Sequence, residues 1–300
     1  MYVNFLSDEL KRKYGRKMYK LALDGGMTCP NRDGKTGSRG CIFCSVHGSG
    51  DFAEEYRGDI REQLDRAKLR IRDKAGDCGY IAYFQSFTNT YAPIEKLRAL
   101  FYDVIGQPDV DVLSIATRPD CLPDETVELL AEINRVKPVW VELGLQTVNA
   151  KTAEYIRRGY DLPVYDDAVK RLKEQGIEVI THMIIGLPGE DKADMVDTAR
   201  YIGQSGADGI KFQLLHVLSG TDLEKEYLQG RFECLSLEEY TEILCDCIRA
   251  IPPEITVHRI TGDGAKRDLV APLWSGNKKH VLNYINRYMR ENNVTQGENV

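Results

Sequence analysis

Three cysteines lie close together near the start of the chain, in the stretch CPNRDGKTGSRGCIFC. Cys29, Cys41 and Cys44 would supply three thiolates, which is the number that a [4Fe-4S] cluster needs when its fourth iron stays open. An open iron can bind a ligand and take part in its chemistry. The same stretch also fits structural zinc, because His47 follows the CxxC pair and would complete a tetrahedral Cys3His site. This stretch alone leaves both interpretations open.

Two features of the surrounding residues favour a cluster. Phe43 directly precedes the last cysteine, where an aromatic ring could pack beside the adenine of a bound nucleoside. Gly34, Gly37 and Gly40 suit a chain that folds tightly around an inorganic body. Neither feature excludes zinc, so the choice depends on the rest of the chain.

The composition describes a chain that can bury a large core. Its 300 residues are 42% hydrophobic, which fits one α/β domain of about the size of a barrel. Acidic residues stand where a signal peptide would be apolar, and no segment is as long as a membrane span. The formal charge of -6 argues against broad, nonspecific attraction to nucleic acid. We expect a soluble protein with no membrane partner.

Eight cysteines at irregular spacings form no disulfide framework in a chain of this length. A cluster with an exchangeable iron needs a reducing compartment, so we expect the protein in the cytoplasm. The sequence assigns no role to the cysteines outside the motif, which are Cys78, Cys121, Cys234, Cys245 and Cys247. Cys245 and Cys247 would point two ways from one helix, so buried small hydrophobic side chains are the favoured interpretation of this pair.

Short β-type runs alternate with helical patterns from residue 17 to about residue 217, which is typical of consecutive β-α units and a parallel sheet. Six strands are expected, over residues 18–26, 80–87, 110–118, 139–147, 177–186 and 209–218. Right-handed crossovers between them predict an α/β fold, a partial (β/α)6 TIM-like barrel of parallel strands. Functional side chains should gather at the carboxyl ends of these strands.

The last third of the chain predicts a C-terminal α/β extension that leans on the barrel. It contains an amphipathic helix over 236–251, a strand over 254–260 and a helix over 278–290, followed by a tail expected to fray. The expected organisation is a basic N-terminal segment (1–16), the barrel (17–220) with its cysteine loop (25–50), the extension (221–291) and the tail (292–300).

Polar side chains follow the second and third predicted strands. Gln85 and Ser86 could hold the amino-acid end of a cofactor, although polar strand ends are common in any fold. Thr117 and Arg118 should face the cavity, because Pro119 ends the strand directly after them. Arg118 could hold a carboxylate or a phosphate.

Glu142 and Gln146 lie four residues apart on the fourth strand, so alternation puts both on one face together with Gly144. If that face points into the barrel, Gln146 could bind a ribose hydroxyl near the strand end. Glu142 would then lie deeper and need a cationic or hydrogen-bonding partner. The alternative is an exposed face, which the apolar neighbours on both sides of the strand disfavour.

Three further candidates have ordinary structural explanations beside the functional ones. Arg158 ends a predicted helix, where a cation complements the dipole. His182 lies in an apolar run, where a histidine is more often a hydrogen-bonded core residue than a ligand. Gly186 opens the turn GLPG, which could pass beside a flat adenine or be a simple tight turn.

The sixth predicted strand carries candidates for substrate contact. Lys211 and Gln213 share one face of this strand, and His216 lies on the other face near its end. Lys211 is a candidate for a substrate contact, and Lys211 and His216 are both candidates for a catalytic role.

A basic run with interleaved tyrosines stands at the front of the chain, where it could bind phosphates or form a solvated surface. The candidate nucleic-acid contacts in it are Lys11, Arg12, Lys13, Arg16 and Lys17, and Lys20 follows them.

Taken in order, CIFC, TRPDCLPDE, WVELGLQT, RRGY, ITHMIIGLPGE and DGIKF resemble the radical-SAM half of the Elongator catalytic subunit, over about residues 17–260. The chain is more closely similar to a short bacterial group that keeps this barrel and lacks the acetyltransferase domain. The resemblance implies a [4Fe-4S] cluster and S-adenosylmethionine as cofactors. It also implies an electron donor such as flavodoxin or ferredoxin.

The resemblance assigns roles to residues that match the motifs of the superfamily. It implies cluster ligation by Cys29, Cys41 and Cys44, and adenine contact by Phe43. It places Gln146, Arg158 and His182 at positions that contact the cofactor.

Two positions depart from the pattern. Related barrels often have a glutamate where this chain has Ala116, and the first cysteine gap is eleven residues instead of three. The long gap does resemble that of Elongator.

Elongator-like enzymes act on the C5 position of the wobble uridine of tRNA, and the resemblance implies the same base here. Without an acetyl-CoA domain we expect remodelling of an existing substituent, for example carboxymethylaminomethyl to aminomethyl. The alternatives are a radical-SAM enzyme of a small molecule such as a porphyrin, or a zinc or iron-sulfur protein that is not an enzyme.

Overall fold

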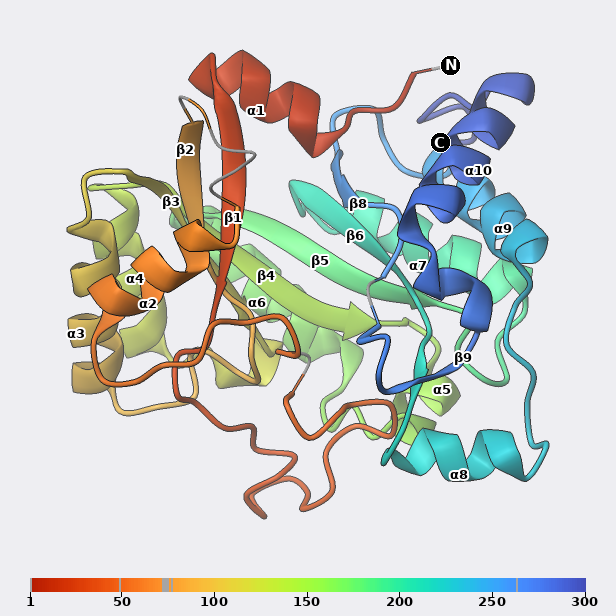
Figure 1. The fold of residues 1–300 in the computed structure, drawn as a ribbon, viewed down its shortest axis with the longest axis horizontal. Helices are drawn as coiled ribbons and strands as arrows, with labels where there is room; N and C mark the ends of the chain where they lie inside the picture. The colour runs from red at the N-terminus through yellow and green to blue at the C-terminus, as the bar shows by residue number, and fades with distance from the viewer. Residues whose placement is uncertain (1, 49, 72–75, 77, 263) are drawn as a thin grey trace.

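A curled sheet of parallel strands forms the body of the protein (Figure 1). The computed structural model describes residues 2–48, 50–71, 76, 78–262 and 264–300. Within them, seven strands pair in the order β1-β2-β3-β4-β5-β6-β8, and β1 and β8 form the two edges. The strands are β1 (Lys17–Leu23), β2 (Cys78–Phe84), β3 (Val110–Thr117), β4 (Val139–Gln146), β5 (Glu178–Ile185), β6 (Gly209–Leu214) and β8 (Thr256–Arg259). The predicted partial barrel is confirmed.

The seventh strand comes from the predicted C-terminal extension. β8 belongs to the extension in sequence, yet it pairs with β6 in parallel and so belongs to the barrel in space. The predicted strand over 209–218 is wrong at its end, because the chain leaves the sheet after Leu214. Val217–Leu218 (β7) then pairs antiparallel with Leu269–Ala271 (β9) in a separate ribbon.

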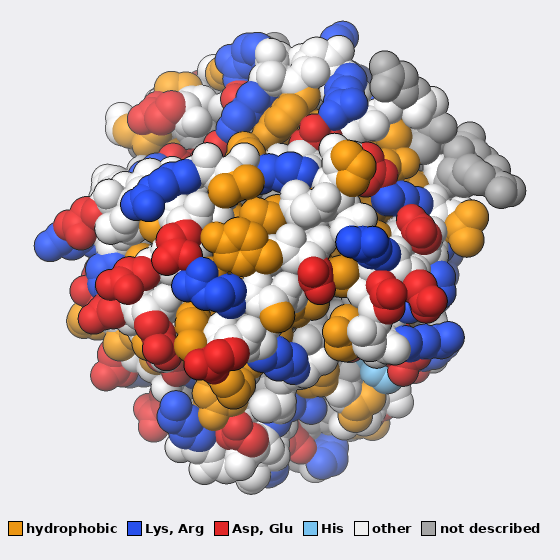
Figure 2. All heavy atoms as spheres, turned by 90° about the vertical axis from the view of Figure 1, so that its left-hand side faces the viewer, with side chains coloured by type: hydrophobic (Ala, Val, Ile, Leu, Met, Phe, Trp, Pro, Cys, Tyr) orange, Lys and Arg blue, Asp and Glu red, His pale blue; other side chains and the backbone are white. Residues whose placement is uncertain are grey.

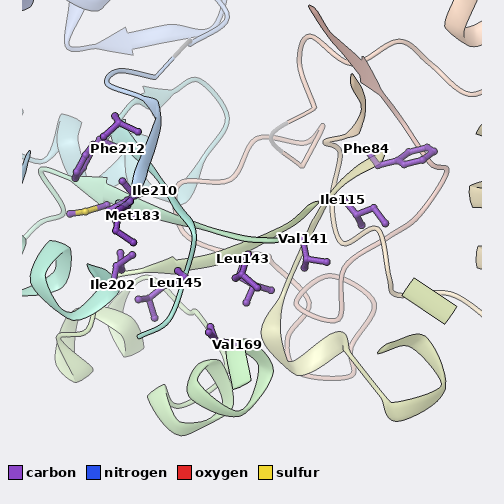
Figure 3. Close-up of a cluster of buried hydrophobic side chains, with 14 of the residues drawn as sticks. Phe84, Ile115, Val141, Leu143, Leu145, Val169, Met183, Ile202, Ile210 and Phe212 are labelled. Carbon is purple, nitrogen blue, oxygen red and sulfur yellow. The ribbon is translucent and has the colours of Figure 1, made fainter. Parts of the chain in front are cut away.

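Helices cover the outer face of the sheet, and apolar side chains fill the space between (Figure 3). Alternation along β4 is clear: Val141, Leu143 and Leu145 point outward into this core, which leaves Glu142 and Gly144 for the inner face. The helices are α2 (Ile60–Leu69), α3 (Ile94–Ile105), α4 (Asp124–Asn134), α5 (Ala150–Tyr155), α6 (Leu162–Glu174), α7 (Lys192–Gln204), α8 (Asp222–Leu228), α9 (Leu237–Arg249) and α10 (Lys278–Glu291).

Local sequence explains where several helices begin and end. Ser236 and Glu239 form a reciprocal capping box that starts α9, one turn before its apolar face. Gly176 follows α6 with a φ of +68°, a left-handed conformation that favours glycine. Cys245 and Cys247 are buried in α9, as expected of small apolar side chains.

The N-terminal segment forms a helix, α1 (Leu6–Tyr14), that closes one end of the barrel. Its Leu10 packs among Ile81, Val112, Trp140 and Ile180 on the inner face of the sheet. The helix packs against both β1 and β8, so it spans the open seam of the barrel (Figure 1). The other end of the barrel remains for the cysteine loop.

The last residues of the chain, expected to fray, are held instead. Gln296 is 3% exposed, and its side chain donates to the carbonyls of Pro252 and Ile255 and accepts from the amide of Asn4. The N- and C-terminal segments therefore lie side by side, as Figure 1 also shows.

Acidic and basic side chains are interspersed on the face that carries α2, α3 and α4 (Figure 2). Such a mixed surface provides no broad field of one sign for a polyanion. Among the described residues, no helix is both long and apolar enough to cross a membrane.

Candidate active site

A cavity of about 740 Å³ occupies the inside of the barrel. Cys29, Cys41 and Cys44 line it at the end where the loop after β1 crosses the carboxyl ends of the strands. At the other end it reaches Leu6 and Leu10 of α1. The cavity thus joins the predicted metal ligands to the polar inner face of the sheet.

The three cysteines are free thiols that line one surface of the cavity. Asn31 fixes this loop, because its side-chain amide donates to the Arg157 carbonyl at 2.7 Å and reaches the Cys41 sulfur at 3.5 Å. Burial raises the pKa of Cys41 to about 12, and the nearby Cys44 adds to the rise. Three thiols whose negative charges would repel one another suit a cationic metal centre that removes the repulsion.

In the described structure the three thiols are not arranged as a complete set of metal ligands. Among the described residues, no three His, Cys, Asp or Glu side chains are arranged as metal ligands. His47 is exposed and lies outside the described lining of the cavity. The Cys3His zinc interpretation therefore lacks its histidine on the cavity side, and three thiolates with an open position fit better.

The predicted polar strand ends divide between the cavity and the core. Gln85, Thr117 and Arg118 line the cavity. Ser86 is buried outside its described lining and packs under the cysteine loop, where a Cβ added at Gly50 would meet its Oγ at 2.0 Å. Ser86 thus supports the position of the loop.

Gln146 ends β4 with a left-handed backbone, at a φ of +71°, beside an irregularity in the pairing of β4 with β5. Its side chain folds back over Gly144, where an added Cβ would meet the Gln146 Nε2 at 2.7 Å. The Tyr160 hydroxyl donates to the Gly144 carbonyl. Glycine at 144 is therefore needed for the amide of Gln146 to occupy this place at the cavity wall.

Arg158 also lines the cavity, but its guanidinium is occupied with the protein backbone. Nη1 donates to the Thr147 carbonyl at 2.7 Å, and Nε donates to the Tyr160 carbonyl at 2.9 Å. Arg118 donates in turn to the Arg158 carbonyl at 2.8 Å and pairs with Asp120. The two arginines brace the strand ends around the cavity.

Glu142 is the centre of a buried polar cluster on the inner face. Its Oε1 accepts from Lys20 at 2.9 Å and from Ser114 at 2.8 Å. Its Oε2 accepts from His182 at 2.7 Å and from Lys211. The expectation that Glu142 needs cationic partners is confirmed, with its side chain fully buried.

The charges of this cluster follow from burial and contacts. Burial opposes ionisation of Glu142, but Lys20 and Lys211 hold the pKa of its carboxyl well below the ordinary value. Burial lowers the pKa of His182 to about 4, so the ring is neutral at pH 7. A neutral ring with Nε2–H toward Glu142 leaves Nδ1 to accept from the Gln213 amide at 3.1 Å.

Lys211, predicted as a substrate contact, lines the cavity floor with its side chain 6% exposed. Its Nζ lies 3.3 Å from the Tyr83 hydroxyl and 4.4 Å from the centre of that ring. His216 also lines the cavity, beside Gly262 and Gly264. A catalytic role for Lys211 and His216 stays a prediction.

Gly186 lies outside the described lining of the cavity. It has a φ of +95°, and an added Cβ would stand 3.1 Å from the Leu235 side chain. Phe43, by contrast, lines the cavity between two of the cysteines.

The basic N-terminal residues lie at the end of the barrel opposite the cysteines. Arg16 pairs with Asp111 at 2.6 Å, and Lys13 pairs with Glu178, both at the amino ends of strands. Arg12 pairs with Glu9 within α1, while Lys11 and Lys17 are exposed. Part of this basic run therefore fastens α1 to the barrel.

Three residues of the buried polar cluster around Glu142 were not predicted from the sequence. Lys20 was grouped with the basic run, although alternation along β1 puts it inside with Met18 and Ala22. Tyr83 and Ser114 also face inward, and only the same alternation on β2 and β3 could have indicated them.

Comparison with known families identifies the family of this chain. Residues 34–202 match the Radical SAM superfamily, and residues 207–291 match the Radical_SAM C-terminal domain. The chain belongs to the radical SAM superfamily. Radical SAM proteins use a [4Fe-4S] cluster and S-adenosylmethionine, and these are the cofactors of this protein.

Some relatives match nearly the whole of this chain, and others match about half of it. The uncharacterized protein YtqA of Bacillus subtilis is 47% identical over 98% of this chain and 91% of its own length. The tRNA uridine(34) acetyltransferase of Dehalococcoides mccartyi is 26% identical over 50% of this chain and 33% of its own length. The archaeal Methanocaldococcus infernus Elp3 structure superposes with a TM-score of 0.68 at 16% identity, over 94% of this chain and 64% of that chain. The likeness to the Elongator branch is thereby shown for the radical SAM region.

Proposed function

We propose that this radical SAM enzyme remodels the C5 substituent of the wobble uridine in tRNA, for example from carboxymethylaminomethyl to aminomethyl. The observation that carries the proposal is the match of the barrel region to a relative named for uridine 34 of tRNA. The superposition on Elp3 supports the same branch of the fold. The match covers 33% of that acetyltransferase, so the proposal does not take over its acetyl transfer.

The residues at the cavity rim would hold the cofactors. Cys29, Cys41 and Cys44 would bind the cluster, and Phe43 and Gln146 would contact the nucleoside. When bound, the cluster and S-adenosylmethionine supply a carbon radical that abstracts a hydrogen atom from the substrate.

The chain itself orients the substrate and keeps water out. The apolar side chains of α1 close the far end of the cavity, which shields a reactive centre from solvent. Lys211 and its hydrogen-bonded neighbours would hold the substituent in one position, as positioning requires. We place the substrate carbon between this floor and the cysteine loop.

The proposed partners are tRNA and an electron donor such as flavodoxin or ferredoxin, in the cytoplasm. Phosphate contacts by Lys11, Arg12, Lys13, Arg16 and Lys17 remain a proposal, with two of these side chains also paired to the barrel. If the run binds tRNA, replacing Arg12, Lys13 and Arg16 by alanine should weaken binding and flatten its dependence on salt.

Nucleoside analysis tests the substrate. Total tRNA from cells with and without the gene should differ in one wobble-uridine species, and identical profiles would remove tRNA as the substrate. Purified protein, reconstituted without oxygen and given S-adenosylmethionine and a reductant, should form 5'-deoxyadenosine. A positive second assay with a negative first one would point to a small-molecule substrate.

Matched cysteine variants control the reconstitution. Cys44→Ala should lose the iron-sulfur absorbance and the formation of 5'-deoxyadenosine. Cys78→Ala should keep both, because Cys78 starts β2 at the opposite end of the barrel.

A further inference from the structure

Positive charge exceeds negative charge inside the cavity. Seven lysine and arginine side chains line its described part, against the carboxylates of Asp51 and Glu142. Near the cysteines the cations have identified uses, since Arg118 pairs with Asp120 and Arg158 donates to backbone carbonyls. At the floor of the cavity, which is formed by Lys20, Glu142 and Lys211, the cations are paired differently.

Two ammonium groups share one carboxylate at the floor. Lys20 and Lys211 both contact Glu142, whose oxygens also accept from Ser114 and His182. Each ammonium has three N–H donors, and the contacts with Glu142 and, for Lys211, with the Tyr83 hydroxyl do not use them all. His182 adds no charge, because its ring is neutral at pH 7.

The floor can be reached from the cavity. The Lys20 side chain is 25% exposed and lines the cavity together with Lys211. Below them the inner face becomes apolar, with Trp140 and Ile180 packed on α1. A small group entering from the cysteine end therefore meets the two ammonium groups before the apolar end of the cavity.

We propose that Lys20 and Lys211 form a carboxylate subsite at the floor of the cavity. Glu142 contacts both ammonium groups, and Arg259 lies beside Lys211 on the neighbouring strand, so the described residues of the floor include more cations than carboxylates. Ammonium–carboxylate hydrogen bonds are among the strong ones, so an incoming carboxylate fits this excess of cations. The carboxylate of the substrate's C5 substituent has this chemistry, and this assignment rests on the proposed function.

Acetate is a probe that does not depend on knowing the substrate. Binding of ¹³C-labelled acetate to the reconstituted protein at pH 7, followed by NMR titration, should be saturable, and acetamide should bind far more weakly. Lys20→Met should weaken acetate binding at least about tenfold, as loss of a charge-assisted hydrogen bond predicts. Lys20→Arg should keep most of the affinity, because it keeps the charge.

The controls separate charge from folding. Lys170→Met removes an ammonium group that is 74% exposed on α6, and it should bind acetate like the parent protein. If circular dichroism shows that Lys20→Met does not fold, Lys211→Met replaces it, since it removes a second ammonium from the same subsite.

Two further measurements identify the source of the carboxylate. Lys20→Met should bind S-adenosylmethionine like the parent protein in equilibrium dialysis, and weaker binding of the cofactor would overturn the assignment to the substrate. A raised KM for tRNA carrying carboxymethylaminomethyluridine, with unchanged cofactor binding, assigns it to the substrate. If the parent protein converts no tRNA, the proposed function fails, while the acetate and cofactor measurements still decide on the subsite. Equal acetate binding by the parent protein and Lys20→Met, or none by either, would overturn it.

Discussion

Replacing Glu142 by glutamine tests the buried cluster most directly. The substitution keeps the size of the side chain and removes the negative charge that Lys20 and Lys211 share. Lys211 is 6% exposed, so its ammonium would be left in a dry place without a counter-charge. Breaking a buried ion pair in this way costs about 3–5 kcal/mol of unfolding free energy.

The expected loss lies near the lower end of that range, at about 3 kcal/mol. Lys20 adds little, because its side chain is 25% exposed and water screens it. Lys211 can also lose its proton, which removes the cost of a buried unpaired charge, since burial already lowers the pKa of this lysine well below its ordinary value. Urea denaturation of Glu142→Gln and the parent protein at pH 7 measures the difference.

The pH dependence of the variant carries a definite sign. Glu142 raises the pKa of Lys211 in the parent protein, so losing its charge lowers that pKa further in the variant. The folded variant then binds fewer protons than the folded parent, and its stability rises with pH relative to the parent. Between pH 7 and 9 the deficit of Glu142→Gln should shrink by up to about 1.4 kcal/mol per pH unit. The double variant Glu142→Gln with Lys211→Met should recover most of the loss and remove this dependence.

An exposed ion pair provides the control. Glu132, which is 43% exposed and pairs with Arg98 at 2.6 Å, should lose less than about 1 kcal/mol on conversion to glutamine. A loss from Glu142→Gln as small as this, with no change between pH 7 and 9, would refute the described charge balance.

Three other changes test separate parts of the structure. Gly144→Ala should displace the Gln146 amide and weaken binding of S-adenosylmethionine in equilibrium dialysis, with little change in melting temperature. Burial raises the pKa of Glu190 to about 7, so the stability from its protonated form is present below about pH 4 and lost as the pH rises through 7. Glu190→Gln should therefore be more stable than the parent protein at pH 8 and equal to it at pH 4, in urea titrations. Leu10→Ala should lower the free energy of unfolding by about 2–5 kcal/mol in the same assay, because it leaves a cavity where α1 packs on the barrel.

The order of strands and helices could be predicted because each buried parallel strand is an apolar run between turn signals. The need of Glu142 for partners could also be predicted, since a buried carboxylate must be compensated. The identity of the partners could not. Lys20 and Lys211 are 122 and 69 residues away along the chain, and only the curl of the sheet brings β1 and β6 to face β4.

The place of β8 shows a second limit of sequence reasoning. Its residues read as a strand, but nothing in their pattern indicates which edge of which sheet they join. In the structure β8 pairs with β6, and α1 packs against β8 and β1 across the seam. Such choices are made by packing over long distances, which local propensity does not record.

Residues from the two ends of the chain complete the barrel wall together. Phe5 and Val257 form an isolated parallel β-bridge, and the amide of Asn4 donates a hydrogen bond to the Gln296 side chain. During synthesis, α1 leaves the ribosome before β8, yet its docking site across the seam is complete only when β8 has followed. The end of the barrel opposite the cysteine loop can therefore close only after translation has passed β8.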